Sequence, residues 1–462
     1  MSNTERLESS SPQDPGRILA TFADMDRDEV ASIVEAAALA QRQWASAAPS
    51  ERANALASAA SRLEKAAGEL TELGIWEVGK PRSEMAGEVA RGVSILRYYA
   101  EEVFSPDGTT LPAADPRGLL LARRRPRGVI ACITPWNFPV AIPLWKLAPA
   151  LAYGNAAVLK PAPAATALAH RLVEILREDL PAGLLGLATG NAKPAQALID
   201  LADAVTFTGS VRVGREIAAR CGALAKPCQA EMGGQNPAIV LPDAELRAAA
   251  KTIAWSAMGY AGQKCTATSR VVVVGDGDQF LEALKTSVAE LAVGDPADAG
   301  VVVGPVISEA ARNRVLEAVA RATQEGGRVI LGGGVLDQSG WFVQPTLVEG
   351  VAADSIVAQE EVFGPFVTIH RARDDQEALE VANGVNYGLV SAVFTSDLDR
   401  ALWFAERLEA GMVRVNAPTA GVDFWAPFGG IKDSSYGPRE QGKAAREFFT
   451  WIQTTTISPA RR

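Results

Sequence analysis

The stretch Val205-Thr206-Phe207-Thr208-Gly209-Ser210-Val211-Arg212-Val213-Gly214 decides the fold class. It begins as a short apolar strand, passes through a glycine turn and opens a helical run that continues to Arg220. A strand followed by a helix also occurs upstream, at 156–179 and at 184–202. Repeated β-α units predict a parallel sheet with helices on both faces, the doubly wound α/β architecture. Ligands of such sheets bind at the carboxyl ends of the strands, which is where Lys160 and Gly209 fall.

The segments on either side of this core extend the α/β pattern. Upstream, helices are expected at 26–43, where Asp26 and Glu29 form a capping box, and at 50–76 and 84–103. Strand-like residues follow at 119–133, with the basic triplet 123–125 interpreted as an exposed hairpin or a subunit contact. Downstream of Glu231 we expect a second α/β region, with strands at 238–241, 270–274 and 389–394 and helices at 243–258, 278–291 and 397–408. The segment 448–457 is expected to form a strand that can pair with the sheet edge of a partner subunit.

Length and composition exclude several classes of protein. The 462 residues exceed what one hydrophobic core normally supports, so two or more domains are expected. The net charge of −9 argues against binding to nucleic acid, which needs a basic surface. No apolar run is long enough to span a membrane, and residues 1–15 lack the core of a signal peptide. Four scattered cysteines favour a reducing cytoplasm.

A thiol, a carboxylate and an amide are the candidate catalytic groups. Cys265 ends the segment Gly262-Gln263-Lys264-Cys265, Glu231 begins a glycine-rich segment and Asn137 lies between Pro135 and Pro139. Such groups, held by Gly and Pro, suggest covalent catalysis on a carbonyl. The two histidines, His170 and His370, are interpreted as structural, so a Cys–His dyad and a metal site are not expected and the base should be a carboxylate. The other three cysteines, Cys132, Cys221 and Cys228, are interpreted as buried bystanders.

Taken together, the motifs resemble those of the aldehyde dehydrogenase superfamily over nearly the whole chain. In order along the sequence they are Thr134-Pro135-Trp136-Asn137-Phe138-Pro139, Lys160-Pro161, Phe207-Thr208-Gly209-Ser210, Glu231-Met232-Gly233-Gly234, Gly262-Gln263-Lys264-Cys265, Glu361-Val362-Phe363-Gly364-Pro365 and Pro427-Phe428-Gly429-Gly430. The resemblance implies that the Cys265 thiolate attacks an aldehyde and forms a thiohemiacetal, which loses hydride to the cofactor and becomes a thioester. It also implies that Asn137 and the Cys265 N–H form an oxyanion hole, and that Glu231 activates water for deacylation.

The resemblance further implies an NAD or NADP cofactor. Its expected binding residues are Trp136, Lys160, Gly209, Ser210, Gly214, Glu361 and Phe363. NAD-preferring relatives often have a glutamate three residues after the lysine, where this chain has Pro163. Loss of that carboxylate, together with the nearby cation Arg212, predicts that NADP is accepted.

Two interpretations of the substrate remain open. The segment 421–442, with Gly421-Val422-Asp423 and Gly437-Pro438-Arg439, is similar to α-ketoglutaric semialdehyde (2,5-dioxopentanoate) dehydrogenases. A substrate carboxylate would need Arg or Lys near the pocket, however, and the loop after Val422 has none. The residues expected around the pocket instead suggest a bulky apolar or aromatic aldehyde; they are Phe138, Ile142, Trp145, Val422, Phe424, Trp425 and Phe428.

The resemblance also implies a domain division. Residues 1–112 and 132–232 are expected to form the dinucleotide-binding domain, 233–432 the catalytic domain, and 113–131 with 445–462 a small β oligomerisation element of a homodimer or homotetramer. A CoA-acylating enzyme is an alternative that Glu231 disfavours. A catalytically silent binding protein is a second alternative, disfavoured by the intact Cys265, Asn137 and Glu231.

Overall fold

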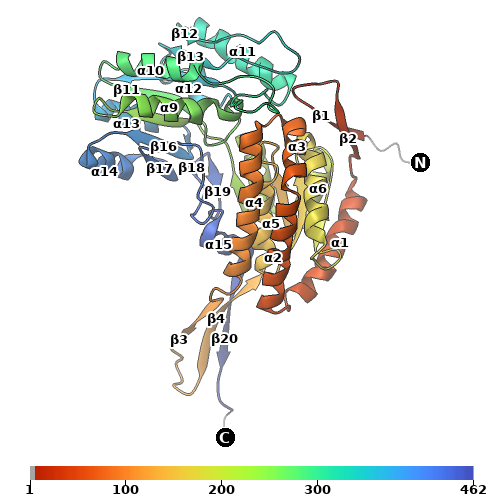
Figure 1. Cartoon of the computed structure of the whole chain (residues 1–462). Helices are drawn as coiled ribbons and strands as arrows, with labels where there is room; N and C mark the ends of the chain where they lie inside the picture. The colour runs from red at the N-terminus through yellow and green to blue at the C-terminus, as the bar shows by residue number, and fades with distance from the viewer. Residues whose placement is uncertain (1–5, 461–462) are drawn as a thin grey trace.

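The computed structural model describes residues 6–460, so the parts of the expected domain ranges at 1–5 and 461–462 lie outside the described residues. Two large sheets with helices around them form the body of the molecule, and a narrow sheet projects from it with the C-terminus near its tip (Figure 1). The fold is α/β, as expected from the strand–helix alternation.

The first large sheet is the predicted parallel sheet that contains the strand beginning near Val205. Its parallel strands are β5 (Val129–Thr134), β6 (Ala156–Pro161), β7 (Leu185–Leu187), β8 (Ala204–Thr208) and β9 (Cys228–Glu231). They lie in the order β9-β8-β5-β6-β7, and the short strand β19 (Ser435–Tyr436) extends β9 antiparallel. The strand order reverses next to β5, and every residue of these five parallel strands is buried. This is the predicted doubly wound arrangement, with its ligand edge at the carboxyl ends of β5, β6 and β8.

Helices pack around this sheet. They are α1 (Arg27–Trp44), α2 (Pro49–Lys65), α3 (Ala67–Val78), α4 (Arg82–Glu102), α5 (Ala141–Ala152), α6 (Thr166–Arg177), α7 (Ala192–Leu201) and α8 (Val211–Ala223). The capping box at Asp26 and Glu29 is confirmed. The expected helix 50–76 is two helices that meet at Ala66. Helix α5 is buried along its whole length, because α4 covers it on one side and β6 lies on the other.

The second large sheet has seven strands in the order β12-β13-β14-β11-β10-β16-β17. Their bounds are β10 (Asn236–Val240), β11 (Thr268–Val274), β12 (Arg328–Leu331), β13 (Thr346–Glu349), β14 (Phe366–Ala372), β16 (Val390–Phe394) and β17 (Met412–Val415). Only β12 is antiparallel to its neighbour. The associated helices are α9 (Leu246–Met258), α10 (Asp278–Ala289), α11 (Glu309–Gln324), α12 (Ile356–Gln359), α13 (Asp375–Asn383) and α14 (Leu398–Arg407).

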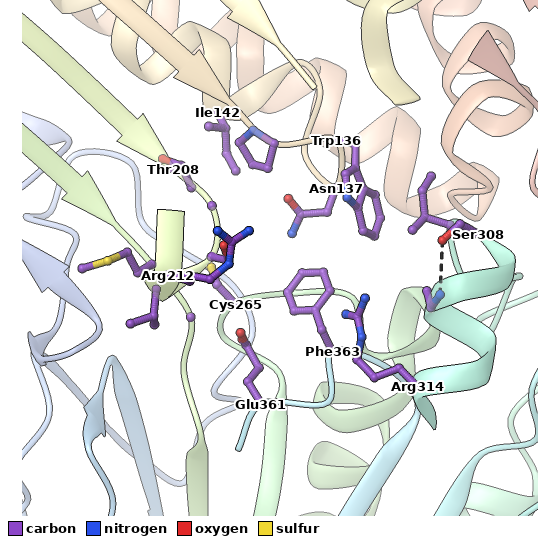
Figure 2. Close-up of a pocket in the computed structure, with 18 of the residues that line it drawn as sticks. Trp136, Asn137, Ile142, Thr208, Arg212, Cys265, Ser308, Arg314, Glu361 and Phe363 are labelled. Carbon is purple, nitrogen blue, oxygen red and sulfur yellow. Dashed lines mark hydrogen bonds between the residues drawn. The ribbon is translucent and has the colours of Figure 1, made fainter. Parts of the chain in front are cut away.

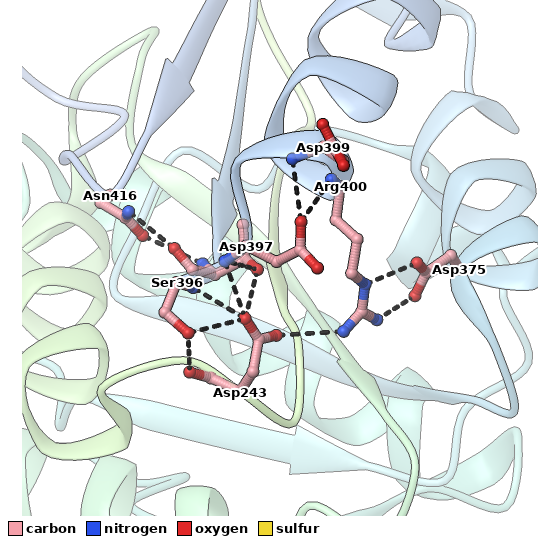
Figure 3. Close-up of polar contacts among 8 residues, drawn as sticks. Asp243, Asp375, Ser396, Asp397, Asp399, Arg400 and Asn416 are labelled. Carbon is pink, nitrogen blue, oxygen red and sulfur yellow. Dashed lines mark hydrogen bonds and ion pairs between the residues drawn. The ribbon is translucent and has the colours of Figure 1, made fainter.

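A polar cluster ties the end of β10 to the end of β16 (Figure 3). The Asp243 carboxylate accepts hydrogen bonds from Thr395 Oγ1 at 2.7 Å and from the Ser396 N–H at 2.8 Å. Arg400, on α14, joins Asp243 at 3.0 Å and also pairs with Asp375. Burial raises the pKa of Asp243, but these hydrogen bonds outweigh it and lower that pKa to about 2. The carboxylate therefore stays ionised and braces the helices against the sheet.

The projecting sheet consists of β3 (Gly108–Leu111), β4 (Leu119–Pro126) and β20 (Thr450–Ile457) in the order β20-β4-β3 (Figure 1). The expected strand 448–457 begins only at Thr450, because Phe448 and Phe449 belong to the short helix α15 (Ala445–Phe449), where they are buried in the core. Strand β3 precedes residue 113 and β5 begins before residue 132. The division into three units therefore stays a proposal. Its boundary at 112/113 separates β3 from its partner β4, and its boundary at 131/132 cuts through β5.

Short elements complete the described chain. They are β1 (Arg6–Ser10), β2 (Ile18–Ala23), β15 (Tyr387–Gly388) and β18 (Ile431–Lys432), with 3₁₀ turns at Pro163–Ala165, Gly259–Gly262 and Gly442–Ala444. None of the helices in residues 6–460 is both long and apolar enough to cross a membrane.

Candidate active site

A cavity of about 480 Å³ opens beside the carboxyl ends of β5 and β8, between the two large sheets. Cys265, Asn137, Glu361 and Phe363 surround the same space in Figure 2, although they come from three separate segments of the chain. Trp136 adds an aromatic wall, with its ring edge-on to Phe363 at 5.8 Å between centroids. The fold therefore gathers most of the residues expected to bind the reactive end of a cofactor.

The loop that carries Cys265 has a strained backbone. Tyr260 and Ala261 have φ angles of 55° and 52°, in the left-handed region that side chains disfavour. Gly262 follows with φ 66°, and a Cβ there would lie 2.3 Å from the carbonyl oxygen of Gly364. Only glycine fits this close approach, which explains the glycine that precedes Cys265 in the sequence.

Two amides fix the loop on either side of the thiol. Asn236 donates from Nδ2 to the carbonyls of Cys265 and Ala267, each at 2.8 Å. On the other side, Gln263 donates to the carbonyl of Pro305 at 3.1 Å and accepts the Ile307 N–H at 2.8 Å. These side chains satisfy buried polar groups and hold the thiol in one position.

Asn137 is held from two directions. Its Nδ2 donates to the carbonyl of Gln263 at 2.9 Å, which joins it to the Cys265 loop and leaves its second N–H free. The backbone carbonyl of Asn137 accepts a hydrogen bond from Lys80 Nζ at 2.9 Å, and Lys80 is paired with Glu88 at 2.6 Å. Glu88 also accepts the N–H groups of Val140 and Ala141 at the start of α5. Asn137 is thus held in the cavity wall beside Cys265, with one side-chain N–H available to a ligand.

The sequence analysis missed the Lys80–Glu88 pair, although a signal was present. Met85, Val89, Gly92 and Leu96 are buried and mark the apolar face of α4, and Glu88 falls on that face. A carboxylate on an apolar helix face must be paired or neutral. Its spacing could therefore have identified Glu88 as a buried, paired acid.

Burial and negative charge set the proton affinity of the candidate nucleophile. Burial, followed by the charges of Glu361 and Glu231, raises the pKa of the Cys265 thiol to about 12. Burial also raises the pKa of Glu361 to about 7, although its carboxylate accepts the Gly234 N–H at 3.1 Å. At neutral pH the thiol of the free site is therefore mostly protonated, and its proton must leave before the sulfur can attack.

Glu231 lies behind the cavity. It ends β9, its Oε2 accepts a hydrogen bond from the Ser435 hydroxyl, and its Oε1 has no partner among the described residues. Oε1 lies only 2.7 Å from the position that a Cβ on Gly429 would occupy. Burial, followed by the charge of Glu440, raises the pKa of Glu231 well above its ordinary value. The structure does not bring Glu231 into the cavity wall, so contact with a substrate requires a side-chain rotation or a water molecule.

A buried charged pair lies next to Glu231. Lys146, on α5, pairs with Glu440 and donates to Thr206 Oγ1 at 2.9 Å. Thr206 in turn donates to Gln229 Oε1 at 3.0 Å. Neither Lys146 nor Ser435 was identified from the sequence, because both are distant from Glu231 along the chain and only the packed fold brings them near it.

A second cavity, of about 770 Å³, extends from the first along the ligand edge of the six-stranded sheet. Lys160 lines it at the end of β6, and burial lowers the pKa of this lysine to about 8, against the opposing charge of Asp24. Gly209, Ser210 and Trp136 line both cavities and connect them.

Gly214 does not line either cavity that Gly209 and Ser210 connect. It lies on α8, where a Cβ would come within 2.4 Å of Met232 Sδ. The structure therefore gives Gly214 a packing position, close to the predicted turn but outside its cavity.

A third cavity, of about 360 Å³, reaches Cys265 from the opposite side. Phe138, Trp145, Val422 and Phe428 line it, and the rings of Trp145 and Phe428 are 5.3 Å apart. Cys265 therefore lies where the cofactor-side cavity meets a mostly apolar one.

Three expected pocket residues lie elsewhere. Ile142 lines the cofactor-side cavity. Phe424 packs on Tyr98 of α4, with 5.9 Å between ring centroids, and Trp425 is 58% exposed. The structure does not bring Phe424 and Trp425 into the third cavity, because the loop directs Val422 inward and turns the following residues away.

The two histidines and the three other cysteines lie apart from the three cavities. His170 lies on α6 beside Glu174 at the surface, and burial lowers the pKa of His370 to about 4. Cys132, Cys221 and Cys228 are buried. Within residues 6–460, no cluster of His, Cys, Asp and Glu has the makings of a metal site.

Comparison with known proteins agrees with this geometry. The aldehyde dehydrogenase family model matches residues 1–455. The chain is 40% identical over 458 residues to the α-ketoglutaric semialdehyde dehydrogenase of Bacillus subtilis (strain 168), covering 97% of this chain and 94% of that protein. It is 39% identical to the α-ketoglutarate semialdehyde dehydrogenase of Haloferax volcanii, with 97% and 95% covered. It is 35% identical to the NADP-dependent succinate-semialdehyde dehydrogenase of Escherichia coli (strain K12), with 98% and 95% covered.

Solved structures give the same result. The crystal structure of PnpE in complex with nicotinamide adenine dinucleotide superposes with a TM-score of 0.95 at 35% identity, covering 98% of this chain and 94% of that one. The chain belongs to the aldehyde dehydrogenase family and is an NAD(P)-dependent oxidoreductase.

Proposed function

We propose that this chain oxidises an aldehyde to a carboxylic acid by covalent catalysis at Cys265. The observation that carries the proposal is the position of Cys265 where two cavities meet, one walled by the expected cofactor residues and the other by apolar side chains. A nucleophile in that position can reach an aldehyde from one side while a hydride acceptor lies on the other.

The cavities on the cofactor side fit an NAD or NADP molecule. A buried lysine, Lys160, lines one end, and Gly209 offers a backbone without a Cβ beside the N-terminus of α8. Glu361 and Phe363 would hold the nicotinamide end beside Cys265. When bound, the nicotinamide accepts the hydride that the thiohemiacetal releases. The chain has Pro163 where a carboxylate would repel a 2′-phosphate, which supports use of NADP as well as NAD.

The residues of the chain perform the remaining steps. The Cys265 thiol releases its proton to solvent water as its sulfur bonds to the aldehyde carbon. The free Asn137 N–H with the Cys265 backbone N–H stabilises the resulting oxyanion. Loss of hydride leaves a thioester on the sulfur. Glu231, whose raised pKa makes its carboxylate a stronger base than usual, takes a proton from water. That water attacks the thioester, which releases the carboxylic acid and the thiol.

The substrate we propose is a semialdehyde of the α-ketoglutaric type. The most similar relatives named above act on such compounds by name, and the cavity walled by Trp145 and Phe428 has room beyond Cys265 for a short chain. A bulky aromatic aldehyde is less well supported, because Phe424 and Trp425 do not contribute to the wall.

Two variants test the assigned roles with NAD and NADP in parallel. Cys265→Ala should abolish the formation of reduced nicotinamide with every aldehyde. Glu231→Gln should retain a rapid first burst of reduced nicotinamide and then turn over slowly, because only deacylation needs the base. Cys221→Ala, which removes another buried thiol, is the matched control and should keep wild-type rates. Normal steady-state turnover by either catalytic variant would contradict the role given to that residue.

We also propose that the projecting sheet joins subunits of a cytoplasmic homodimer or homotetramer. β20 is an edge strand whose outward side chains include Trp451 and Ile452, 44% and 59% exposed. Exposed apolar side chains on an unpaired strand edge favour association with another subunit.

A further inference from the structure

The cavity that leads from the surface to Cys265 contains an arginine that the sequence analysis did not consider. Arg91 lies on α4 and lines this cavity together with Phe138, Trp145 and Val422. It is half-buried. The expected cation for a substrate carboxylate was sought in the loop after Val422, whereas this guanidinium comes from a helix far upstream in the sequence.

The charged groups of the cavity are paired with one another, with the exception of Arg91. Glu84 accepts from Lys264 Nζ at 2.6 Å, and Glu88 from Lys80 Nζ at 2.6 Å. Arg91 forms neither an ion pair nor a hydrogen bond with any residue from 6 to 460. Its five N–H donors have no partner among the described residues, so the guanidinium can bind an anion that enters the pocket.

The acid in the loop that carries Val422 does not pair with Arg91. Asp423 follows Val422 directly, but its carboxylate is directed to Arg414 Nη1 at 3.5 Å, and Arg414 also donates to the Gly421 carbonyl at 2.9 Å. Asp423 is not among the residues that line the cavity. The loop therefore contributes an apolar side chain to the pocket and keeps its own acid outside.

The distribution of polarity along the pocket matches one type of molecule. Cys265 at the inner end receives an aldehyde, the rings of Phe138, Trp145 and Phe428 can contact methylene groups, and Arg91 offers an anion-binding fork. A carboxylate is the planar anion that a guanidinium binds with two parallel hydrogen bonds. An aldehyde with an ammonium group at its far end would meet repulsion at the same position.

We infer that Arg91 binds the carboxylate at the far end of the substrate, and that the enzyme therefore selects ω-oxo carboxylates over uncharged aldehydes of equal length. This inference rests on the proposed oxidation at Cys265 and assigns the residue that recognises the rest of the substrate. Arg91 contributes binding, and the chemistry at Cys265 does not require it.

The test compares two aldehydes that differ only in the carboxylate, 5-oxopentanoate and pentanal, with α-ketoglutaric semialdehyde as a third substrate. Arg91→Gln should lower kcat/KM for both carboxylated substrates by roughly 10- to 100-fold, mainly through KM, which is the range for loss of a charge-assisted hydrogen bond. The value for pentanal should stay within about twofold, because pentanal has no group for the guanidinium. Arg91→Lys should restore part of the lost selectivity by keeping the charge without the fork.

Arg97→Gln is the matched control, because Arg97 lies on the same helix and pairs with Glu64 at the surface, 52% exposed. It should leave both substrates unaffected, and thermal unfolding should show that both glutamine variants are folded. Wild-type enzyme that reduces no cofactor with any aldehyde would overturn the oxidation at Cys265. If the wild-type enzyme oxidises aldehydes but Arg91→Gln affects 5-oxopentanoate and pentanal equally, Arg91 does not bind the substrate carboxylate. The proposed oxidation at Cys265 would then still hold.

Discussion

Replacement of Lys80 by Met tests how strongly the buried pair under Asn137 stabilises the site. The side chains of Lys80 and Glu88 are 0% and 1% exposed, and Nζ lies 2.6 Å from Oε2. Nζ also donates to the Asn137 carbonyl at 2.9 Å and lies 3.4 Å from the centre of the Phe138 ring. Methionine fills a similar volume but leaves the Glu88 carboxylate without its cation in the interior.

We expect a large loss of folding stability when one charge of the pair is removed, and a small loss when both are removed. Removing one partner of a buried ion pair typically costs about 3–5 kcal/mol, because the other charge stays buried and unpaired. Glu88→Gln alone should cost a similar amount. The double variant Lys80→Met with Glu88→Gln removes both charges, and the amide oxygen can still accept the N–H groups of Val140 and Ala141. We expect the double variant to lose only about 1–2 kcal/mol, because replacing both members of a buried pair is often near neutral.

Urea unfolding of the four proteins measures this as a double-mutant cycle, with equal m-values as the requirement for comparison. The same samples give kcat, which should fall roughly 10- to 100-fold in Lys80→Met, because the backbone that carries the Asn137 side chain loses one of its fixed contacts. A loss of stability in the double variant equal to the sum of the two single losses would refute the argument that Lys80 and Glu88 act as a pair.

The remaining predictions concern acid stability and assembly. Asp243 has a pKa of about 2 in the folded chain against an ordinary 3.8, so its ionised form contributes stability above about pH 4 that is lost as the pH falls through 2. Asp243→Asn should therefore cost about 1 kcal/mol at pH 7, after allowance for its 30% exposure, and denaturant unfolding should show this difference from wild type shrinking between pH 4 and pH 2; a constant difference would contradict the assignment. Ile452→Lys, on the edge strand β20, should lower the mass measured by light scattering from an oligomer to a smaller species, whereas an unchanged oligomer would place the subunit contact elsewhere.

Local signals determined much of this protein. The capping box at Asp26 and Glu29 depends on residues three apart, and the strand–helix change at Val205 depends on neighbours within a few turns. The glycine at position 262 is visible in the sequence, and the tight turn before Cys265 requires it because a side chain there would collide with the Gly364 carbonyl. Such features are short-range, so the order of residues contains them.

The tertiary structure alone decided which distant side chains share a cavity. Arg91 and Val422 line the same pocket, although more than 300 residues separate them in the sequence. Arg91 lies on α4, beside the first large sheet, and Val422 lies in a loop near the C-terminus. Phe424 and Trp425 have the composition expected of a pocket wall, yet the direction of one turn carries them away from it. Ser435 reaches Glu231 only because β19 pairs with β9. Periodicity records which face of an element is apolar, whereas the partner that covers this face depends on how all the elements pack together.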